Sequence, residues 1–205
     1  FFPILQTATS SKKIIGKITM GQYDILPQSH LNFYKKFDNI IVFNDKQKDF
    51  YLSNYQFNHV LTLDIMIPNE INLLKVITRE SLGTKNLVFG FLGRISREKN
   101  ILDMILLLDY LNNKNRLQCK LIIQGEGDDS YIKELMGKIK ELNLSQFVIF
   151  NNWLIDPMLT HDFFEIIDVF LVTSTHEGGP ITALEAAAAG RIILGYDIGA
   201  TNNRF

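Results

Sequence analysis

The sequence has few residues of several types, and each shortage excludes a class of protein. Its 205 residues include one cysteine, Cys119, so no internal disulfide framework can form. Because Cys119 precedes a strand-like run, we expect a packed thiol rather than a nucleophile. Lysine and arginine (21) nearly balance aspartate and glutamate (22), and the net charge of −1 gives no general attraction to nucleic acid or anionic membranes.

Long apolar runs are also missing. The run from Met104 to Leu108 is followed at once by Asp109, and none reaches the length of a membrane-spanning helix. The chain begins with Phe1 rather than methionine, lacks a basic signal-peptide head, and stops at Phe205 just after a strand and turn. We therefore expect the chain to be a piece of a longer protein.

Two motifs of metal and cofactor enzymes are missing as well. The sequence has no Asp-x-Asp triplet to hold a divalent ion, since Asp128 and Asp129 are adjacent, and we expect neither a metal site nor a cofactor. Neither Gly125-Glu126-Gly127 nor Gly90-Phe91-Leu92-Gly93 extends to the Gly-x-Gly-x-x-Gly fingerprint of dinucleotide-binding proteins. This disfavours an NAD-dependent oxidoreductase.

Short apolar runs alternate with helix-like segments over most of the chain. Strands are predicted at residues 39–43, 59–63, 87–92, 120–124, 147–150, 166–172 and 191–195. Helices are predicted at residues 45–52 (capped by Asp45), 99–111, 130–142 and 158–164, and from Pro180 to a stop at Gly190. Strands separated by helices of this length predict an α/β fold with a doubly wound parallel sheet, in which ligands bind beyond the carboxyl ends of the strands.

Residues 66–85 interrupt this alternation with a polar stretch. We interpret the stretch as a linker or domain crossover. The predicted organisation is therefore a first domain at residues 1–65, the linker, and a second, larger domain at residues 86–205.

The most informative segment combines a glycine-rich turn with two glutamates. Glu177-Gly178-Gly179-Pro180 follows an apolar strand and precedes an alanine-rich helix, in which Glu185 stands eight positions after Glu177. Glycines let a ligand approach the backbone, and a helix N-terminus offers free N–H groups with a partial positive charge. Helical rise puts the two glutamates about two turns, or ~12 Å, apart, which suits an elongated ligand with its phosphates at the turn. Taken alone, Glu177 would simply cap the helix.

A second strand-to-helix turn carries two cations. Gly93-Arg94 follows the strand predicted at 87–92, and Lys99 comes five residues after Arg94. Cations near a helix start are unfavourable for the helix dipole unless an anion neutralises them. The plain interpretation is a solvated turn in which Arg97, Glu98 and Lys99 form surface pairs. Together with the glutamate segment we favour a diphosphate clamp, in which arginine acts as a fork and lysine as a point charge.

Two weaker motifs lie at other strand ends. Gly125-Glu126-Gly127 follows the strand at 120–124 and is explained equally well by a plain turn and by a nucleotide contact. In Phe150-Asn151-Asn152-Trp153, backbone groups at a strand end could contact a flat base, and we interpret Trp153 as a packing residue or pocket wall.

In their order and approximate spacing, these motifs resemble the C-terminal half of family 4 glycosyltransferases of the GT-B fold. The resemblance runs from about residue 86 to 200 and rests on Gly93-Arg94 with Glu98-Lys99, on Gly125-Glu126-Gly127, and on the segment from Glu177 to Glu185. It implies two Rossmann-like domains that face a cleft, the C-terminal one holding the nucleotide-sugar donor. Residues 1–65 would be the closing part of the acceptor-side domain.

The resemblance implies a set of donor-binding residues at several strand ends. Its members are Gly93, Arg94, Lys99, Asn152, Glu177, Gly178, Gly179 and Glu185. The two cations would bind the diphosphate, Glu177 and the glycine amides the sugar, and Glu185 the ribose hydroxyls, while the backbone near Asn152 would face the base. Glu177, Arg94 and Lys99 are the implied catalytic residues. The cations could stabilise the charge on the leaving nucleoside diphosphate without a metal.

The implied activity is transfer of a sugar from a nucleotide sugar to a glycan or lipid-linked acceptor, with retention of anomeric configuration. The family's common donors are UDP-sugars, and typical products are polysaccharides or lipopolysaccharides. The resemblance implies a cytoplasmic protein without a nucleic-acid partner, and it allows peripheral association with the inner face of the membrane through a preceding N-terminal part. The enzyme class implied is a hexosyltransferase. We expect the fragment alone to be inactive.

The sequence departs from the family pattern in two places. Gly179 stands where members often have a bulky residue, and residues 199–203 lack the glutamate that usually follows a glycine pair, which leaves the role of this loop open. We interpret His176 as a supporting group rather than a catalyst. Two other functions share the fold: a GT-B sugar-nucleotide 2-epimerase, which would need further acids and a histidine around the sugar, and a non-catalytic nucleotide-sugar-binding module.

Overall fold

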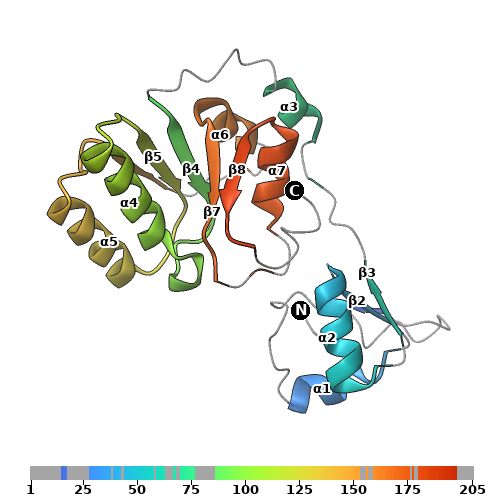
Figure 1. Ribbon diagram of the computed structural model, residues 1–205. Coiled ribbons are helices and arrows are strands. Elements are labelled where there is room, and N and C mark those ends of the chain that lie inside the picture. Colours follow the sequence, from blue (N-terminus) through green and yellow to red (C-terminus); the bar gives the residue numbers. More distant parts are fainter. Residues whose placement is uncertain are drawn as a thin grey trace. The chain divides into compact units, whose positions relative to one another are not determined.

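Figure 1 shows the protein as a computed structural model. The structure describes residues 15–17, 28–37, 39–42, 44–57, 59–62, 67, 70–76, 86–152, 156, 159–175, 177 and 180–197. Contacts within the chain divide these residues into two units. The first holds the described residues up to 62 together with Glu177, and the second holds those at 67–175 and 180–197.

The first unit contains a three-stranded parallel sheet and two helices. Its strands lie in the order β1 (Ile15–Lys17), β2 (Asn39–Val42) and β3 (Val60–Thr62), and α1 (Gln28–Tyr34) and α2 (Asp45–Tyr55) connect them along the chain. Its core consists of Ile40, Val42, Tyr51, Phe57 and Val60. The strands predicted at 39–43 and 59–63 are present, although positions 43 and 63 lie outside the described residues. The sequence analysis did not predict β1 and α1.

Asn44, and not the predicted Asp45, caps the N-terminus of α2. Asn44 Oδ1 accepts a hydrogen bond from Gln47 N at 2.7 Å and so satisfies an N–H group that has no partner within the helix. Asp45 is the first helical residue, and its carboxylate accepts a hydrogen bond from the Thr62 hydroxyl at 2.6 Å. Both residue types are good caps, so the sequence alone could not distinguish the two neighbours.

The second unit is a five-stranded parallel sheet with the strand order β6-β5-β4-β7-β8. Its strands are β4 (Val88–Leu92), β5 (Lys120–Gln124), β6 (Val148–Asn151), β7 (Val169–Val172) and β8 (Ile192–Gly195). All four strand pairings are parallel. The structure therefore confirms the predicted doubly wound α/β sheet.

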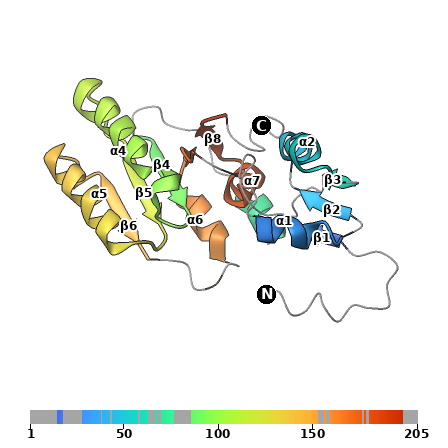
Figure 2. The same cartoon turned by 90° about the horizontal axis from the view of Figure 1, so that it is seen from below.

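Helices cover both faces of this sheet because successive strand residues point to opposite sides. On one face, α4 (Ile101–Asp109) and α5 (Asp129–Glu141) pack on alternate residues such as Phe89 and Leu121. On the other, α3 (Glu70–Lys75), α6 (Thr160–Ile166) and α7 (Ile181–Ala188) pack on Ile122 and Phe170. Figure 2 shows α4 and α5 side by side, away from α6 and α7.

Several helix bounds differ from the predictions. The predicted helix at 99–111 is divided into a 3-10 turn η3 (Arg97–Lys99), α4, and a π-helical turn η4 (Tyr110–Lys114). Asn100 separates η3 from α4 because it adopts a left-handed conformation, with φ of 50°. The predicted helix at 158–164 extends to Ile166, so β7 begins at Val169 rather than at residue 166.

The helix α3 lies within the stretch predicted as a linker. Leu73 is fully buried, and with Val76 it joins the core formed by α6 and α7. The Arg191 guanidinium donates to Val76 O at 2.9 Å and to Ile167 O at 3.2 Å, which fastens the end of α3 to the sheet. Tertiary packing therefore stabilises a helix that is too short to form on its own.

Two expectations from composition concern Cys119 and membrane spans. Cys119 is buried, as predicted, and its backbone N–H and C=O bond the side chain of Asn112 at 2.8 and 2.9 Å. Of the helices in the described ranges, none is long and apolar enough to cross a membrane.

Candidate functional site

The strand order places a topological switch point between β4 and β7. From β4 the chain proceeds through β5 to β6, and it then returns to the other side of β4 to form β7 and β8. Ligands in such sheets bind at the carboxyl ends of the strands that flank this point. Gly93 directly follows β4 and Thr173 directly follows β7, so the loops that begin there border the candidate site.

The loop after β4 is fixed to the loop after β5. Gly93 N donates to Gln124 O at 3.0 Å, and Ile95 N donates to Glu126 O at 2.7 Å. Ile95 also forms a parallel bridge with Gly127, and its side chain is buried. These bonds hold the first half of the β4–α4 loop, including Gly93 and the neighbouring arginine, at the edge of the sheet.

The Gly125-Glu126-Gly127 turn is explained by this contact between loops. A Cβ atom at Gly125 would meet the carbonyl oxygen of Gly93, and one at Gly127 would meet that of Ile95. Both glycines therefore permit the close approach of two backbone segments. Of the two interpretations of this turn, the structure favours the plain turn.

Lys99 is anchored beside β7 through its backbone. Its carbonyl oxygen accepts a hydrogen bond from the Thr173 hydroxyl at 2.9 Å, and the carbonyl oxygen of Glu98 accepts one from the Thr175 amide at 2.8 Å. Lys99 is itself half-buried in the turn η3. The second half of the loop is thus tied to the strand on the other side of the switch point.

Arg94 is exposed and forms an ion pair with Glu98, four residues further on. The side chains are 69% and 45% exposed, respectively. Arg97, which the plain interpretation pairs with its sequence neighbours, instead binds Glu134 on α5. The carboxylate of Glu98 therefore contacts the guanidinium of Arg94, which we assign to the donor diphosphate.

Glu185 is a buried carboxyl group on α7, with only 3% of the residue exposed. Burial raises the pKa of this carboxyl group to about 7 from the ordinary 4.5, because the charged form is poorly solvated inside the protein. A carboxylate at such a position is stabilised by a ligand that donates hydrogen bonds to it. This carboxyl group is the strongest sign of a ligand site in the second unit.

The structure changes the predicted geometry of the two glutamates. The helix α7 begins at Ile181, after the N-cap Pro180, so Glu185 lies only about one turn from the helix N-terminus. Because Glu177 precedes the N-cap, helical rise applies only to the part of the span after Pro180 and does not by itself set the separation of the two glutamates.

Glu177 itself is half-buried and groups with the first unit. Because Pro180 occupies the N-cap position of α7, Glu177 does not. Gly178 and Gly179, which we expect to contact the sugar, lie outside the described residues, as do His176 and Trp153. The structure brings Gly93, Arg94 and Lys99 into one loop, but it leaves the sugar end of the predicted site undescribed.

Asn152 follows β6 and is exposed. Its carbonyl oxygen accepts a hydrogen bond from the side-chain amide of Gln124, the last residue of β5, which is buried. Since β5 separates β6 from β4, Asn152 lies two strands from Gly93. A nucleotide with its base at Asn152 and its phosphates at the β4–α4 loop would therefore extend across the end of β5.

Three polar residues after β7, Thr173-Ser174-Thr175, were not recognised in the sequence analysis. Thr173 and Ser174 are buried, and Thr173 and Thr175 bond the backbone of the β4–α4 loop. The available signal was a run of hydroxyl side chains directly after an apolar strand. Such a run suggests a polar strand end, but it does not identify the loop that the hydroxyls contact.

The adjacent acids Asp128 and Asp129 lie at the start of α5. Asp128 is the N-cap and accepts hydrogen bonds from the Ser130 hydroxyl and from Tyr131 N, at 2.9 Å for the latter, and these bonds lower the pKa of its carboxyl group. Asp129 lies in the first helical turn. A group of three or more histidine, cysteine or acidic residues that could hold a metal ion is not found in the described ranges.

Comparison with known proteins identifies the family. The profile of the family described as "Glycosyl transferases group 1" matches residues 76–203, more than half of the chain. The chain therefore belongs to the group 1 glycosyl transferases. Among curated protein sequences no significant match is found.

Solved structures of glycosyltransferases share the GT-B fold with this chain. A mutant of S. aureus TarM, in complex with fondaparinux, alpha-GlcNAc-glycerol and UDP, is 17% identical over 92% of this chain, with a TM-score of 0.71. The pneumococcal O-GlcNAc transferase GtfA, in complex with UDP and GlcNAc, is 18% identical over 92%, also with a TM-score of 0.71. Anabaena Alr3699/HepE, in complex with UDP and glucose, is 19% identical over 93%, with a TM-score of 0.69. The chain spans 38%, 38% and 55% of these proteins, respectively.

Proposed function

We propose that the protein transfers a hexosyl group from a UDP-sugar to a glycan or lipid-linked acceptor, with retention of configuration and without a metal ion. The observation that carries the proposal is the β4–α4 loop, in which Arg94 and Lys99 lie at the switch point of a group 1 glycosyl transferase fold. UDP as the nucleotide is supported by the structural relatives, three of which were solved with UDP bound.

The chemistry of the reaction explains the need for these cations. Cleavage of the sugar–phosphate bond leaves a nucleoside diphosphate with additional negative charge. Fixed positive groups next to the leaving oxygens lower the barrier because they need no reorganisation when the charge develops. Arg94 supplies a planar fork for two phosphate oxygens, and Lys99 supplies a compact charge. We assign both to the diphosphate and regard them as catalytic residues.

We assign the remaining donor-binding residues as the resemblance to the family implies. Glu185 accepts hydrogen bonds from the ribose hydroxyls, which suits a buried carboxyl group whose pKa is raised to about 7. Glu177, with the amides of Gly178 and Gly179, holds the transferred sugar and balances positive charge that develops on its ring. The backbone near Asn152 contacts the base. This is a family 4 arrangement, and we further propose that the protein acts at the cytoplasmic face of a membrane.

Transfer by the full-length protein tests this proposal. We expect label from a radiolabelled UDP-sugar to appear in an acceptor, and we expect the Arg94→Ala variant to lose most of this activity. Lys140→Ala is the matched control, because Lys140 is an exposed cation on α5, remote from the β4–α4 loop in sequence. Binding of UDP-sugars without turnover would instead identify a non-catalytic nucleotide-sugar-binding module, and failure to bind any of them would contradict the proposal.

A further inference from the structure

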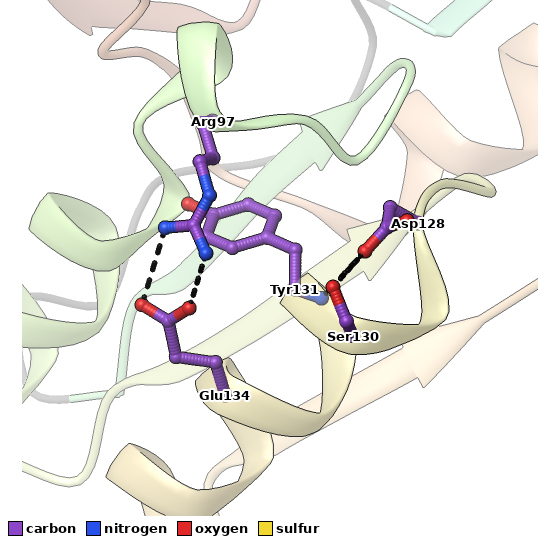
Figure 3. Close-up of polar contacts among 5 residues, drawn as sticks. All are labelled: Arg97, Asp128, Ser130, Tyr131 and Glu134. Carbon is purple, nitrogen blue, oxygen red and sulfur yellow. Dashed lines mark hydrogen bonds and ion pairs between the residues drawn. The ribbon is translucent and has the colours of Figure 1, made fainter.

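A cluster of polar side chains joins the β4–α4 loop to the first turns of α5 (Figure 3). The Arg97 guanidinium donates two hydrogen bonds to Glu134, with Nη2–Oε2 at 2.6 Å and Nη1–Oε1 at 3.4 Å. The same guanidinium lies over the ring of Tyr131, with Cζ 4.9 Å from the ring centroid. A planar guanidinium bound at two points and packed on a ring has little freedom to turn.

The partners of Arg97 belong to a well-held part of the helix. Tyr131 is buried, with 5% of the residue exposed, in the core between α4 and α5. Its backbone N–H donates to the N-cap Asp128, whose carboxylate also bonds the Ser130 hydroxyl. Figure 3 shows these contacts on the same turn of α5. Arg97 thus packs on a buried tyrosine ring while its guanidinium binds the exposed carboxylate of Glu134.

Backbone bonds hold the loop at its two ends, and Arg97 lies between them. Gly93 and Ile95 bond the loop after β5, while Glu98 and Lys99 accept hydrogen bonds from residues after β7. Between these attachments the ion pair of Arg97 with α5 fastens the turn η3. The pair therefore contacts the loop segment that separates the two cations assigned to the diphosphate.

This pair contributes little to global stability. Its side chains are 70% and 52% exposed, and exposed ion pairs generally contribute little to the free energy of unfolding. Its effect on ligand binding can be larger, because a loop that is already held in the bound conformation loses less entropy when the ligand binds.

We propose that Arg97 is a positioning residue, which holds Arg94 and Lys99 in the geometry that binds a nucleoside diphosphate without contacting the ligand itself. The inference rests on the proposed donor-binding function and adds to it a contact that belongs to α5 rather than to the donor site. It requires that Glu134 matter for diphosphate binding as much as Arg97, although Glu134 carries the same charge as the ligand.

Calorimetric titration of the full-length protein with UDP and with uridine tests this inference. We expect Arg97→Ala and Glu134→Ala each to weaken UDP binding by about threefold to tenfold. The double variant should bind UDP as well as either single variant, because both substitutions remove the same contact. Uridine affinity and the melting temperature should stay unchanged. The matched control is Lys138→Ala, which breaks an exposed pair with Glu141 (2.7 Å) on the same helix without touching the loop.

Three results would overturn the inference. If only Arg97→Ala weakened UDP binding, Arg97 would be a direct ligand, because Glu134→Ala leaves its positive charge in place. If neither variant changed UDP affinity while Arg94→Ala did, the positioning role would fail and the proposed donor site would stand. If Arg94→Ala also had no effect, the diphosphate assignment itself would fail together with the positioning role.

Discussion

The change of Glu185 to glutamine should make the protein more stable at alkaline pH and less able to bind nucleosides. Burial raises the pKa of this carboxyl group to about 7, whereas in the unfolded chain it loses its proton near 4.5. Between these values the folded state binds more protons than the unfolded state, so the free energy of unfolding falls as the pH rises from 4.5 to 7 and is constant above. The shift corresponds to a cost of about 3 kcal/mol at pH 8.

Glutamine has nearly the same shape as glutamate but cannot ionise. We therefore expect Glu185→Gln to raise the melting temperature at pH 8, with a much smaller difference at pH 5, as measured by scanning calorimetry of the full-length protein. Glu126→Gln is the control, because Glu126 is exposed and its substitution should leave the melting temperature unchanged at both pH 8 and pH 5. An equal change at both pH values, or a less stable variant at pH 8, would refute the claim that burial raises the pKa of Glu185.

The same variant should fail to bind uridine. We assign the carboxylate of Glu185 as the acceptor of hydrogen bonds from the ribose hydroxyls, so in the unmodified protein uridine affinity should fall as the pH drops through 7 and the group becomes protonated. Uridine has no phosphate whose own titration could produce this dependence. In Glu185→Gln, uridine affinity should be low and independent of pH between 6 and 8. A stabilised variant with normal uridine affinity would show that the buried carboxyl group has no part in binding.

The other residues of the candidate site give three further predictions. Arg94→Ala and Lys99→Ala should each weaken UDP binding far more than uridine binding, since hydrogen bonds to charged groups contribute roughly 1.5–3 kcal/mol; equal losses for both ligands would refute the clamp. Glu98→Gln should strengthen UDP binding by up to about fivefold, because UDP no longer competes with a carboxylate for the guanidinium of Arg94, and weaker binding would contradict this. Glu177→Gln should lower kcat at least about tenfold with an unchanged melting temperature, whereas a normal kcat with a reduced melting temperature would leave it a structural role only.

The sequence was sufficient to predict the parallel sheet of the second unit and the strand ends that border the candidate site. The segment Lys120–Gln124 was predicted as a strand and is β5 residue for residue, with Gly125 directly after its last residue. Bounds failed where neighbouring residues competed for one position, as Asn44 and Asp45 did at the start of α2. They also failed at Asn100, whose left-handed conformation ends η3 before α4 begins.

Parts of the site depend on contacts that no local pattern reveals. Arg97 and Glu134 are 37 residues apart, and their pairing follows from the packing of α5 beside the β4–α4 loop. The sequence indicated that Glu185 lies on a helix, but it could not show that the residue is buried or that burial raises the pKa of its carboxyl group. The spacing argument for the two glutamates used helical rise over all eight positions, although the helix predicted from Pro180, and observed from Ile181, covers only the later part of that span.

The structure of the full-length protein with UDP bound tests the central claim most directly. We predict hydrogen bonds from Arg94 and Lys99 to the diphosphate, and from the ribose hydroxyls to the carboxylate of Glu185, at the carboxyl ends of β4 and β7. UDP bound away from this edge, or at it with the diphosphate out of reach of both cations, would contradict the account.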